Sequence, residues 1–423
     1  MRPDALTPEL ADVVARTRDF VREVVVPAEP PTGEALAPQE LSRLRSLAKE
    51  AGVWAPVSSA DFGGLGLPLP AWSPVLQEAG YSPIGPAVLH CMAPDEGNMH
   101  MLSLIATPEQ QQEFLAPLVR GEARSCFAMT EPHPGAGSDP SALSTTAYLD
   151  GDTWVIEGRK RFISGANDAD IAIVMARTPA VRLPDGQERP EGATMFLTRT
   201  DAPGWRVGRQ IRTTERAIAG GHPYVHLEGL RVPTSAVLGE VGEGFRYAQV
   251  RLGPARLTHC MRWLGLARRA LDVALDRLEH RELFGQPMRD LGLAQGLVAD
   301  SVIDLETSDA IIDRTARLLE SDPRAGSRMS SVAKVHCAEA IQRVIDRSIQ
   351  LCGGDGVSEE LPLVQYLLEV RPFRIYDGSS ETHRWAIARR ASSDRRREVE
   401  AGTPRLDLVD GTDDGAEHGG GRA

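Results

Sequence analysis

The chain has 423 residues, of which 42% are hydrophobic and 25% charged, and its 59 acidic and 47 basic residues give a formal net charge of −12. This length predicts two or three domains with a large core. The negative charge argues against a nucleic-acid-binding surface, no stretch has the roughly 20 apolar residues of a membrane span, and the N-terminus lacks the layout of a secretion signal. We expect a cytoplasmic protein that neither binds nucleic acid nor spans a membrane.

Helical periodicity dominates from residue 6 to about 124. Apolar residues recur at steps of three and four in 13–24 and again in 41–48. A glycine-rich loop at 61–66 interrupts the pattern, and Thr107, followed by a proline, has the position of a helix N-cap. These features predict an N-terminal helical domain over residues 1–124.

Short β-favouring runs replace the helical pattern near residue 126. They occupy 154–156, 171–175, 194–197 and 224–227, with turns such as Asp150-Gly151-Asp152 between them. Because no helix-length pattern intervenes, an antiparallel sheet or barrel is favoured over βαβ units. The sequence therefore predicts a middle β domain over residues 125–242.

Long apolar stripes begin near residue 243. They follow helical spacing through 257–278, 298–319 and 332–345, as in a four-helix bundle. We therefore predict an α+β protein whose C-terminal helical bundle covers residues 243–390. From residue 391 onward Asp, Glu, Arg and Gly dominate, which predicts a disordered tail over 391–423.

The common nucleotide and metal motifs are incomplete. No stretch completes the G-x-G-x-x-G pattern or a Walker loop, which disfavours Rossmann and P-loop sites. The odd number and wide spacing of the cysteines argue against disulfides and a structural zinc site. These five residues are Cys91, Cys126, Cys260, Cys337 and Cys352. We expect reduced cysteines and no metal.

Two segments of the β region carry candidate binding chemistry. In 129–139, small residues would let backbone amides approach an anionic or carbonyl-bearing ligand, and Thr130 and Ser138 add hydroxyl groups. Phe162 could stack on a planar ring while Ser164 hydrogen-bonds its edge. Taken alone, the first segment fits an ordinary Gly/Pro loop equally well, and the second fits better a strand end with a core Phe.

Two further segments lie in the C-terminal part. Arg281 could clamp a pyrophosphate and Phe284 could cover a ring, although a helix C-terminus has the same residues. Gly353 and Gly354 offer bare backbone to a ligand. Asp377 is a lone carboxylate in a tight turn, and most Asp-Gly pairs are simply turns.

Together, in this order and spacing, the segments resemble the acyl-CoA dehydrogenase family from about residue 6 to 390. The matching pieces are Phe62–Gly66, Met129–Asp139, Phe162-Ile163-Ser164, Arg281 with Phe284-Gly285, Gln350 with Gly353-Gly354, and Ile375–Gly378. The resemblance implies a helical N-terminal domain, a middle β domain and a C-terminal bundle in a homodimer or homotetramer that carries FAD.

The same resemblance implies the site residues. FAD would contact Met129, Thr130, Gly137, Ser138, Phe162, Ser164, Arg281, Phe284, Gln350, Gly353, Gly354, Ser379 and Glu381. The segments at Arg281 and Gln350 would reach the adenosine-diphosphate portion, typically of the FAD held by a neighbouring subunit. The acyl-CoA would contact Ser138, Arg256 and Gly378.

The chain departs from the family pattern at the catalytic base. The usual residue is a glutamate in an Ile-Tyr-Glu-Gly turn, and this chain has Asp377, whose side chain is shorter by about 1.5 Å. Residues 253–256, where some members carry the base, contain no carboxylate. The chain thus resembles a branch with aspartate bases. In addition, His133-Pro134 lengthens the flavin loop, and Gly292 replaces a common glutamine.

The expected reaction is FAD-dependent α,β-dehydrogenation of an acyl-CoA thioester. Asp377 would take the α-proton, flavin N5 would accept the β-hydride, and an electron-transferring flavoprotein would reoxidise the flavin. Two alternatives stay open: an oxidase on the same scaffold, of acyl-CoA or nitroalkane type, and a non-catalytic protein that binds CoA thioesters. The length and branching of the acyl group, and whether CoA or a carrier protein holds it, also stay open.

Overall fold

Helices form the first part of the chain. The computed structural model describes residues 6–137, 139–182, 186–217 and 220–403. The helices of the first part are α1 (Pro8–Phe20), α2 (Pro38–Glu50), α3 (Leu69–Gly80), α4 (Gly85–Val88), α5 (Asp95–Ile105), α6 (Pro108–Gln110) and α7 (Ala116–Arg120). The predicted N-cap is confirmed, because the Thr107 hydroxyl accepts from the amide of Gln110 and the Gln110 side chain accepts from the amide of Thr107.

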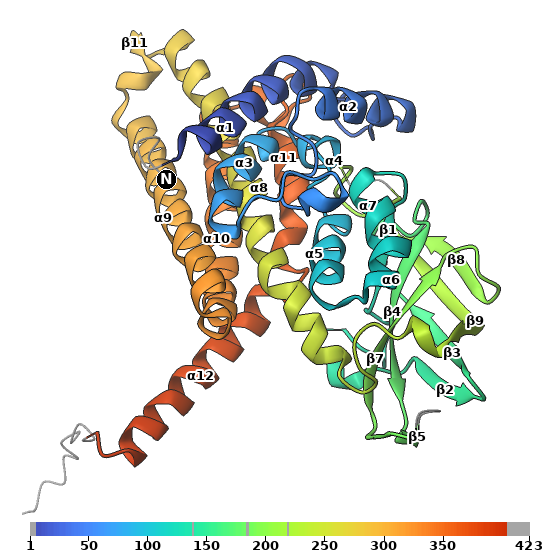
Figure 1. Cartoon of the computed structure of the whole chain (residues 1–423). Helices are drawn as coiled ribbons and strands as arrows, with labels where there is room; N and C mark the ends of the chain where they lie inside the picture. The colour runs from blue at the N-terminus through green and yellow to red at the C-terminus, as the bar shows by residue number, and fades with distance from the viewer. Residues whose placement is uncertain (1–5, 138, 183–185, 218–219, 404–423) are drawn as a thin grey trace, which may run out of the picture.

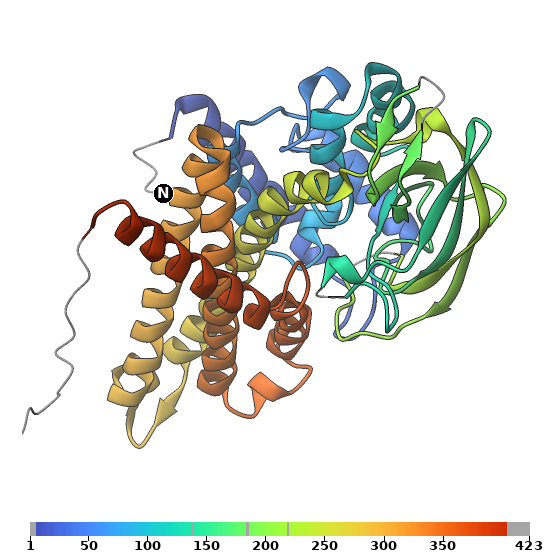
Figure 2. The same cartoon turned by 90° about the horizontal axis from the view of Figure 1, so that it is seen from below.

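A curled sheet follows and packs beside the helices (Figures 1 and 2). Its strands are β1 (Ser125–Ala128), β2 (Thr146–Asp150), β3 (Thr153–Lys160), β4 (Ile171–Thr178), β7 (Gly192–Arg199), β8 (Trp205–Gln210) and β9 (Pro223–Pro233). The strand order is β1-β4-β2-β3-β9-β8, with β7 also on β4. A small hairpin of β5 (Val181–Arg182) and β6 (Glu188–Arg189) stands apart.

The middle β domain is confirmed, with one difference in its pairing. Antiparallel pairing holds for β2–β3, β3–β9, β8–β9 and β4–β7, but β4 pairs in parallel with β1 and β2. The chain travels from β1 through the β2–β3 hairpin before it returns as β4, so β1 and β4 can run in the same direction. Alternating hydrophobicity reports which face a residue occupies and not the strand direction, so the sequence could not show this.

Long helices form the last part. They are α8 (Gly244–His280), α9 (Gly292–Ser321), α10 (Pro323–Cys352), the shorter α11 (Leu363–Val370) and α12 (Ser380–Glu400). A short hairpin of β10 (Glu282–Leu283) and β11 (Gln286–Pro287) joins α8 to α9. Apolar side chains of α8, α9 and α10 share one core with those of α3, so the two helical parts are packed into one body.

The backbones of α3 and α8 come into direct contact. A Cβ atom on Gly80 of α3 would overlap the carbonyl oxygen of Arg262, and one on Gly265 of α8 would overlap the carbonyl oxygen of Gln77. Only glycine permits this approach. Among the described residues, no helix is both long and apolar enough to cross a membrane.

The expectation of disorder from residue 391 is wrong for 391–400. Helix α12 continues to Glu400 and projects from the bundle (Figure 1). Its exposed turns carry ion pairs three residues apart, between Asp394 and Arg397 and between Arg395 and Glu398. Such pairs, together with the helix-forming tendency of Arg and Glu, stabilise a polar helix. The rest of the predicted tail, from residue 404, lies outside the described residues.

Candidate active site

Asp377 lies in a turn between α11 and α12 that the bundle holds rigidly. Its φ is +54°, which is uncommon for a residue with a side chain. Arg256 Nε and His383 Nε2 donate to its carbonyl oxygen at 3.0 and 3.1 Å. Lys334 Nζ donates to the carbonyl of Gly378 at 2.7 Å. The two predicted substrate residues therefore lie next to Asp377: Arg256 of α8 donates to its carbonyl oxygen, and Gly378 follows it in the turn.

Burial lowers the pKa of two of these donors, His383 and Lys334. It lowers the pKa of His383 to about 4, so this ring is neutral when it donates to Asp377. It also lowers the pKa of Lys334 to about 8, although the charge of Asp377 opposes the change. Lys334 therefore remains charged at neutral pH and keeps a cation beside the turn.

His259 binds the Asp377 carboxylate directly. Its Nε2 lies 3.1 Å from Asp377 Oδ2, and its Nδ1 lies 2.9 Å from Arg262 Nη2. A guanidinium can only donate, so Nδ1 must accept and the ring proton must be on Nε2. Burial of the ring and the charge of Arg262 also lower the pKa of His259. His259 is thus a neutral donor to Asp377.

Arg262 extends this chain to α5. It is completely buried, pairs with Glu96 Oε2 at 3.3 Å and donates to the Cys91 carbonyl at 2.8 Å. Glu96 also accepts from the Thr258 hydroxyl at 2.9 Å. The Glu96–Arg262–His259 chain was not predicted from the sequence. The available signal was a pair of polar residues three apart on α8, inside its apolar stripe.

The carboxyl group of Asp377 is ionised at neutral pH. Its side chain is 20% exposed, and burial by itself raises its pKa. The hydrogen bond from His259 and the positive charges of Arg251 and Arg256 outweigh burial and hold the pKa below the ordinary value of an aspartate. Asp377 is therefore available to accept a proton.

A second polar cluster joins α5, α8 and β1 beside this turn. Arg251 Nε donates to Asn98 Oδ1 at 2.8 Å, and its guanidinium lies 4.5 Å from the ring centre of Phe127. Asn98 in turn donates to the Ser125 hydroxyl at 2.9 Å, and Ser125 donates to Asp95. The cluster fixes the start of the β domain against the helices. The sequence analysis missed it because its members are far apart along the chain.

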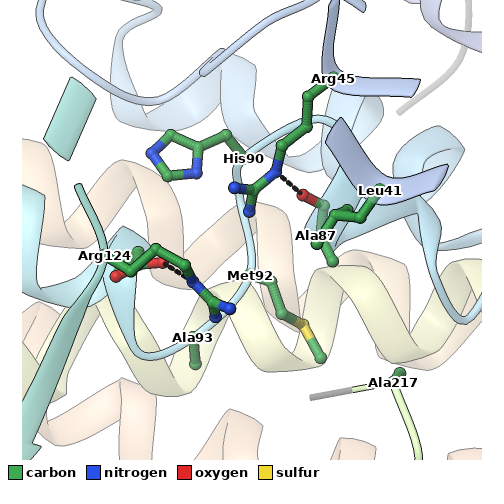
Figure 3. Close-up of a pocket in the computed structure, with 9 residues that line it drawn as sticks. Leu41, Arg45, Ala87, His90, Met92, Ala93, Arg124 and Ala217 are labelled. Carbon is green, nitrogen blue, oxygen red and sulfur yellow. Dashed lines mark hydrogen bonds and ion pairs between the residues drawn. The ribbon is translucent and has the colours of Figure 1, made fainter. Parts of the chain in front are cut away.

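A small cavity adjoins Asp95 (Figure 3). Its volume is about 10 Å³, and Figure 3 shows the guanidinium groups of Arg45 and Arg124 beside it. Arg45 Nε donates to the Ala87 carbonyl at 3.1 Å, and Arg124 lies 3.7 Å from Asp95. This volume suits a single water molecule. The cavity is too small for a cofactor and does not include Asp377.

The β domain brings its predicted cofactor residues together. Met129 and Thr130 follow β1, Phe162 and Ser164 follow β3, and Arg161 N donates to the Thr130 carbonyl at 2.8 Å. The Phe162 ring is 43% exposed on a backbone with φ +56°. An exposed aromatic face beside two hydroxyl-bearing loops suits a planar ring system. Gly137 is exposed, whereas Ser138 lies outside the described residues.

A buried ion pair supports the loop that follows β1. Lys160 Nζ lies 2.8 Å from Glu131 Oε1 and donates to the Met175 carbonyl at 2.6 Å, and both charged side chains are fully buried. Glu131 also accepts from the amides of Ser144 and Thr145. Burial lowers the pKa of Lys160 to about 8, and Glu131 opposes this change, so both groups are charged at neutral pH. The pair closes the loop over 131–145.

Lys160→Met is expected to lower the free energy of unfolding by about 3–5 kcal/mol, because it leaves a buried carboxylate without its counter-charge. Chemical denaturation of the purified protein measures this loss. Arg231→Met is the matched control: Arg231 pairs with Asp150 at 2.8 Å on the surface, and its loss should cost about 1 kcal/mol or less. Equal losses in the two variants would contradict a supporting role of the buried pair.

The β domain also reaches the turn that carries Asp377. Between β8 and β9, the Thr214 hydroxyl donates to the Leu368 carbonyl of α11 at 3.0 Å, and Arg216 N donates to Glu369 at 2.6 Å. Burial raises the pKa of Tyr376, and the negative charge of Glu215 raises it further. Glu215 therefore lies close enough to act on the residue that precedes Asp377. The segment between β8 and β9 thus contacts α11, the helix that leads into the turn of Asp377.

The third group of predicted cofactor residues lies elsewhere. Arg281 follows His259 by 22 residues, which is roughly 33 Å along α8. Phe284 is 94% exposed, and a Cβ on Gly353 or Gly354 would touch nothing within 4 Å. Gln350 is on the last turn of α10 beside them. One chain thus does not bring Arg281 to Asp377, and the expectation that this group serves a neighbouring subunit stays a prediction.

Ser379 and Glu381 have local partners at the start of α12. The Ser379 hydroxyl accepts from the Thr382 amide at 3.2 Å as the N-cap of the helix. The Glu381 side chain is 74% exposed and lies 3.8 Å from Arg384. Both residues are close to Asp377 along the chain. Their predicted contact with the cofactor stays a prediction.

Comparison with known families identifies the fold. Models of the N-terminal, middle and C-terminal domains of acyl-CoA dehydrogenases match residues 7–122, 126–223 and 242–392. The chain belongs to the acyl-CoA dehydrogenase family. The family resemblance inferred from the motifs and the three-part fold are therefore confirmed.

Individual relatives agree with this assignment. The chain is 35% identical to the protein named probable acyl-CoA dehydrogenase FadE2 of Mycobacterium tuberculosis, over 91% of this chain and 96% of that one. It is 35% identical to acyl-CoA dehydrogenase family member 11 of Gallus gallus, over 89% of this chain but only 50% of that protein, so it spans about half of that relative. The structure of butyryl-CoA dehydrogenase from Megasphaera elsdenii matches with 25% identity and a TM-score of 0.79, over 92% of this chain and 99% of that one.

Membership of the acyl-CoA dehydrogenase family implies an oxidoreductase that uses a flavin. The described residues fit such a group, because the partly exposed Phe162 ring lies beside loops that carry hydroxyl groups, with the Arg161 guanidinium 4.6 Å from its ring centre. In addition, Glu215 Oε2 is buried without a hydrogen-bond partner among the described residues, which leaves a strong acceptor near the same loops.

Proposed function

We propose that this member of the acyl-CoA dehydrogenase family catalyses FAD-dependent α,β-dehydrogenation of an acyl-CoA thioester with Asp377 as the base. The carboxylate of Asp377, hydrogen-bonded to His259 in a turn held by Arg256, His383 and Lys334, carries the proposal. A group that removes a weakly acidic proton must be both deprotonated and well placed.

The residues of the β domain would hold the cofactor. Phe162 would pack against the ring system, while Met129, Thr130 and Ser164 line the same pocket. The bound FAD supplies the hydride acceptor. As the family resemblance implies, Arg281, Phe284, Gln350, Gly353 and Gly354 would bind the adenosine-diphosphate portion of a cofactor in a second subunit. Roughly 33 Å of α8 separate Arg281 from His259, the partner of Asp377.

Asp377 would take the α-proton of the thioester on its carboxylate. The backbone amide of the same residue would donate to the thioester carbonyl, as the family resemblance implies, and stabilise the developing negative charge. Arg256 and His383, which bind the carbonyl oxygen of Asp377, would fix the residue that carries both groups. Because an aspartate is shorter than a glutamate, the thioester would have to lie closer to this firmly placed backbone. An electron-transferring flavoprotein would then accept the electrons.

Anaerobic mixing with a panel of acyl-CoA thioesters tests the proposed reaction. We expect loss of the flavin absorbance with at least one of them, and a trace of 2-enoyl product in the quenched mixture. Rapid oxygen consumption without an added acceptor would instead identify an oxidase. A protein that binds acyl-CoA but never bleaches would contradict the proposal.

A further inference from the structure

A chain of three polar side chains begins at the half-buried Ser164. The Ser164 hydroxyl lies 2.9 Å from His222 Nδ1, and His222 Nε2 lies 2.8 Å from Glu215 Oε1. The side chains of His222 and Glu215 are only 8% and 7% exposed. Neither residue was among the candidates from the sequence. The structure thus holds two buried polar side chains in series behind Ser164, and the proposed reaction gives them no role.

The backbone fixes this geometry on both sides. Ile163 N donates to the Pro223 carbonyl at 3.1 Å and Gly165 N donates to the Gly221 carbonyl at 2.8 Å, so the loop of Ser164 is paired with that of His222. The loop of Glu215 is anchored to α11, where the carboxylate of Glu369 accepts from the next amide. The three side chains therefore cannot separate without breaking main-chain hydrogen bonds.

The chemistry of the donors determines how the Ser164 hydroxyl points. An ionised Glu215 only accepts, so His222 Nε2 carries a proton. If the ring is neutral, Nδ1 accepts the Ser164 proton and the hydroxyl oxygen offers its lone pairs outward. If the ring is charged, Nδ1 donates to the hydroxyl oxygen and the Ser164 proton turns outward. In both cases His222 sets the orientation of Ser164.

We propose that His222 and Glu215 are positioning residues that act through Ser164 to set the affinity and the reduction potential of the flavin. This inference rests on the proposed function, because that function puts Ser164 at the edge of the ring. Reduction of a flavin adds a proton to a ring nitrogen, so its edge changes from an acceptor to a donor. An oriented hydroxyl that can serve either state matches this change.

Glu215 adds an electrostatic contribution. Its second carboxylate oxygen, Oε2, is buried and has no hydrogen-bond partner among the described residues. A buried negative charge near the ring opposes the addition of electrons. Glu215→Gln keeps the shape and can still hydrogen-bond His222, but it removes the charge. We therefore expect the midpoint potential of Glu215→Gln to be more positive than that of the unaltered protein.

The test compares holoenzymes in the absence of substrate. Ser164→Ala and His222→Leu should each weaken FAD binding about tenfold, as expected for one lost hydrogen bond, and the double variant should be no weaker than either single one. In His222→Asn the amide oxygen can take the place of Nδ1, so FAD binding should be largely restored. His226→Leu is the control. His226 lies in β9, four residues after His222, and is not part of the Ser164–His222–Glu215 chain of hydrogen bonds, so this variant should bind FAD normally.

Fluorescence titration of the apoprotein with FAD and spectroelectrochemical measurement of the midpoint potential provide the readouts. Because Ser164→Ala buries no new charge, it keeps the test valid even if His222→Leu does not fold. Additive losses in the double variant, or unchanged affinity and potential in all variants, would overturn the inference.

The outcomes also separate this inference from the proposed function. If acyl-CoA bleaches the unaltered protein but the variants keep normal FAD affinity and midpoint potential, the positioning role of His222 and Glu215 is wrong and the proposed dehydrogenation stands. If the variants change FAD affinity as expected but no acyl-CoA bleaches the flavin, the positioning role of His222 and Glu215 stands and the proposed reaction is wrong. A chain that takes up no FAD would overturn both.

Discussion

Asp377→Asn is expected to keep its FAD and lose at least about a hundredfold in the rate of flavin bleaching by acyl-CoA. A general base contributes roughly 10²–10⁴ to such a step, and a carboxamide cannot take up the α-proton. The amide oxygen can still accept from His259 Nε2, which lies 3.1 Å from the carboxylate, so the turn should keep its conformation. Single-turnover stopped-flow absorbance under anaerobic conditions measures the rate.

A second Asp-Gly turn provides the matched control for this variant. Asp355 precedes Gly356 at the far end of α10, and its exposed carboxylate pairs with Arg277 at 2.6 Å. Asp355→Asn should bleach at the rate of the unaltered protein. If Asp377→Asn also bleached normally, Asp377 would not be the base and the proposed mechanism would have to be abandoned.

His259→Leu is expected to move the acidic limb of the kcat/KM profile upward by about 1–2 pH units. In the folded protein the pKa of Asp377 lies below its ordinary value, so activity that requires the carboxylate is lost only as the pH falls through this low pKa. Removing the hydrogen bond from His259 lets burial raise the pKa. A bond to a charged group is worth about 1.5–3 kcal/mol, and one pKa unit corresponds to about 1.4 kcal/mol.

Restoration by a conservative variant distinguishes this effect from general damage. His259→Gln can still donate to Asp377, so its acidic limb should lie close to that of the unaltered protein. His336→Leu alters a histidine of α10 that contacts Thr307 and not Asp377, and it should leave the profile unchanged. An acidic limb that stays in place in His259→Leu would show that Arg251 and Arg256 alone hold the carboxylate in its charged form.

The sequence predicted the elements of this fold where one face of an element is buried. The apolar stripe of α8 and the runs that became β3, β4, β7 and β9 are patterns of burial, and hydrophobic periodicity reports burial directly. It does not report strand direction, so the parallel pairing of β4 was missed. It also missed the polar helical turns at 391–400, whose stability comes from charge pairs and not from apolar contacts.

The candidate site was predictable only where its residues form local motifs. Asp377, Phe162 and Ser164 each lie in a short recognisable run. By contrast, Glu96 and Arg262 are 166 residues apart in the chain and meet in the core. A charged residue inside the apolar stripe of a helix indicates that it has a buried partner of opposite charge. The sequence does not identify that partner.

The glycine contact between α3 and α8 has a consequence for how the chain can be divided. The motifs divide it into three successive regions, yet the first and last share one core and touch through bare backbone at Gly80 and Gly265. The same stretch of α8 carries His259 and Arg262. An N-terminal region exchanged with that of a relative would therefore bring a foreign helix surface against the helix that carries this histidine, and chimaeras at this junction should be built with both helices from one parent.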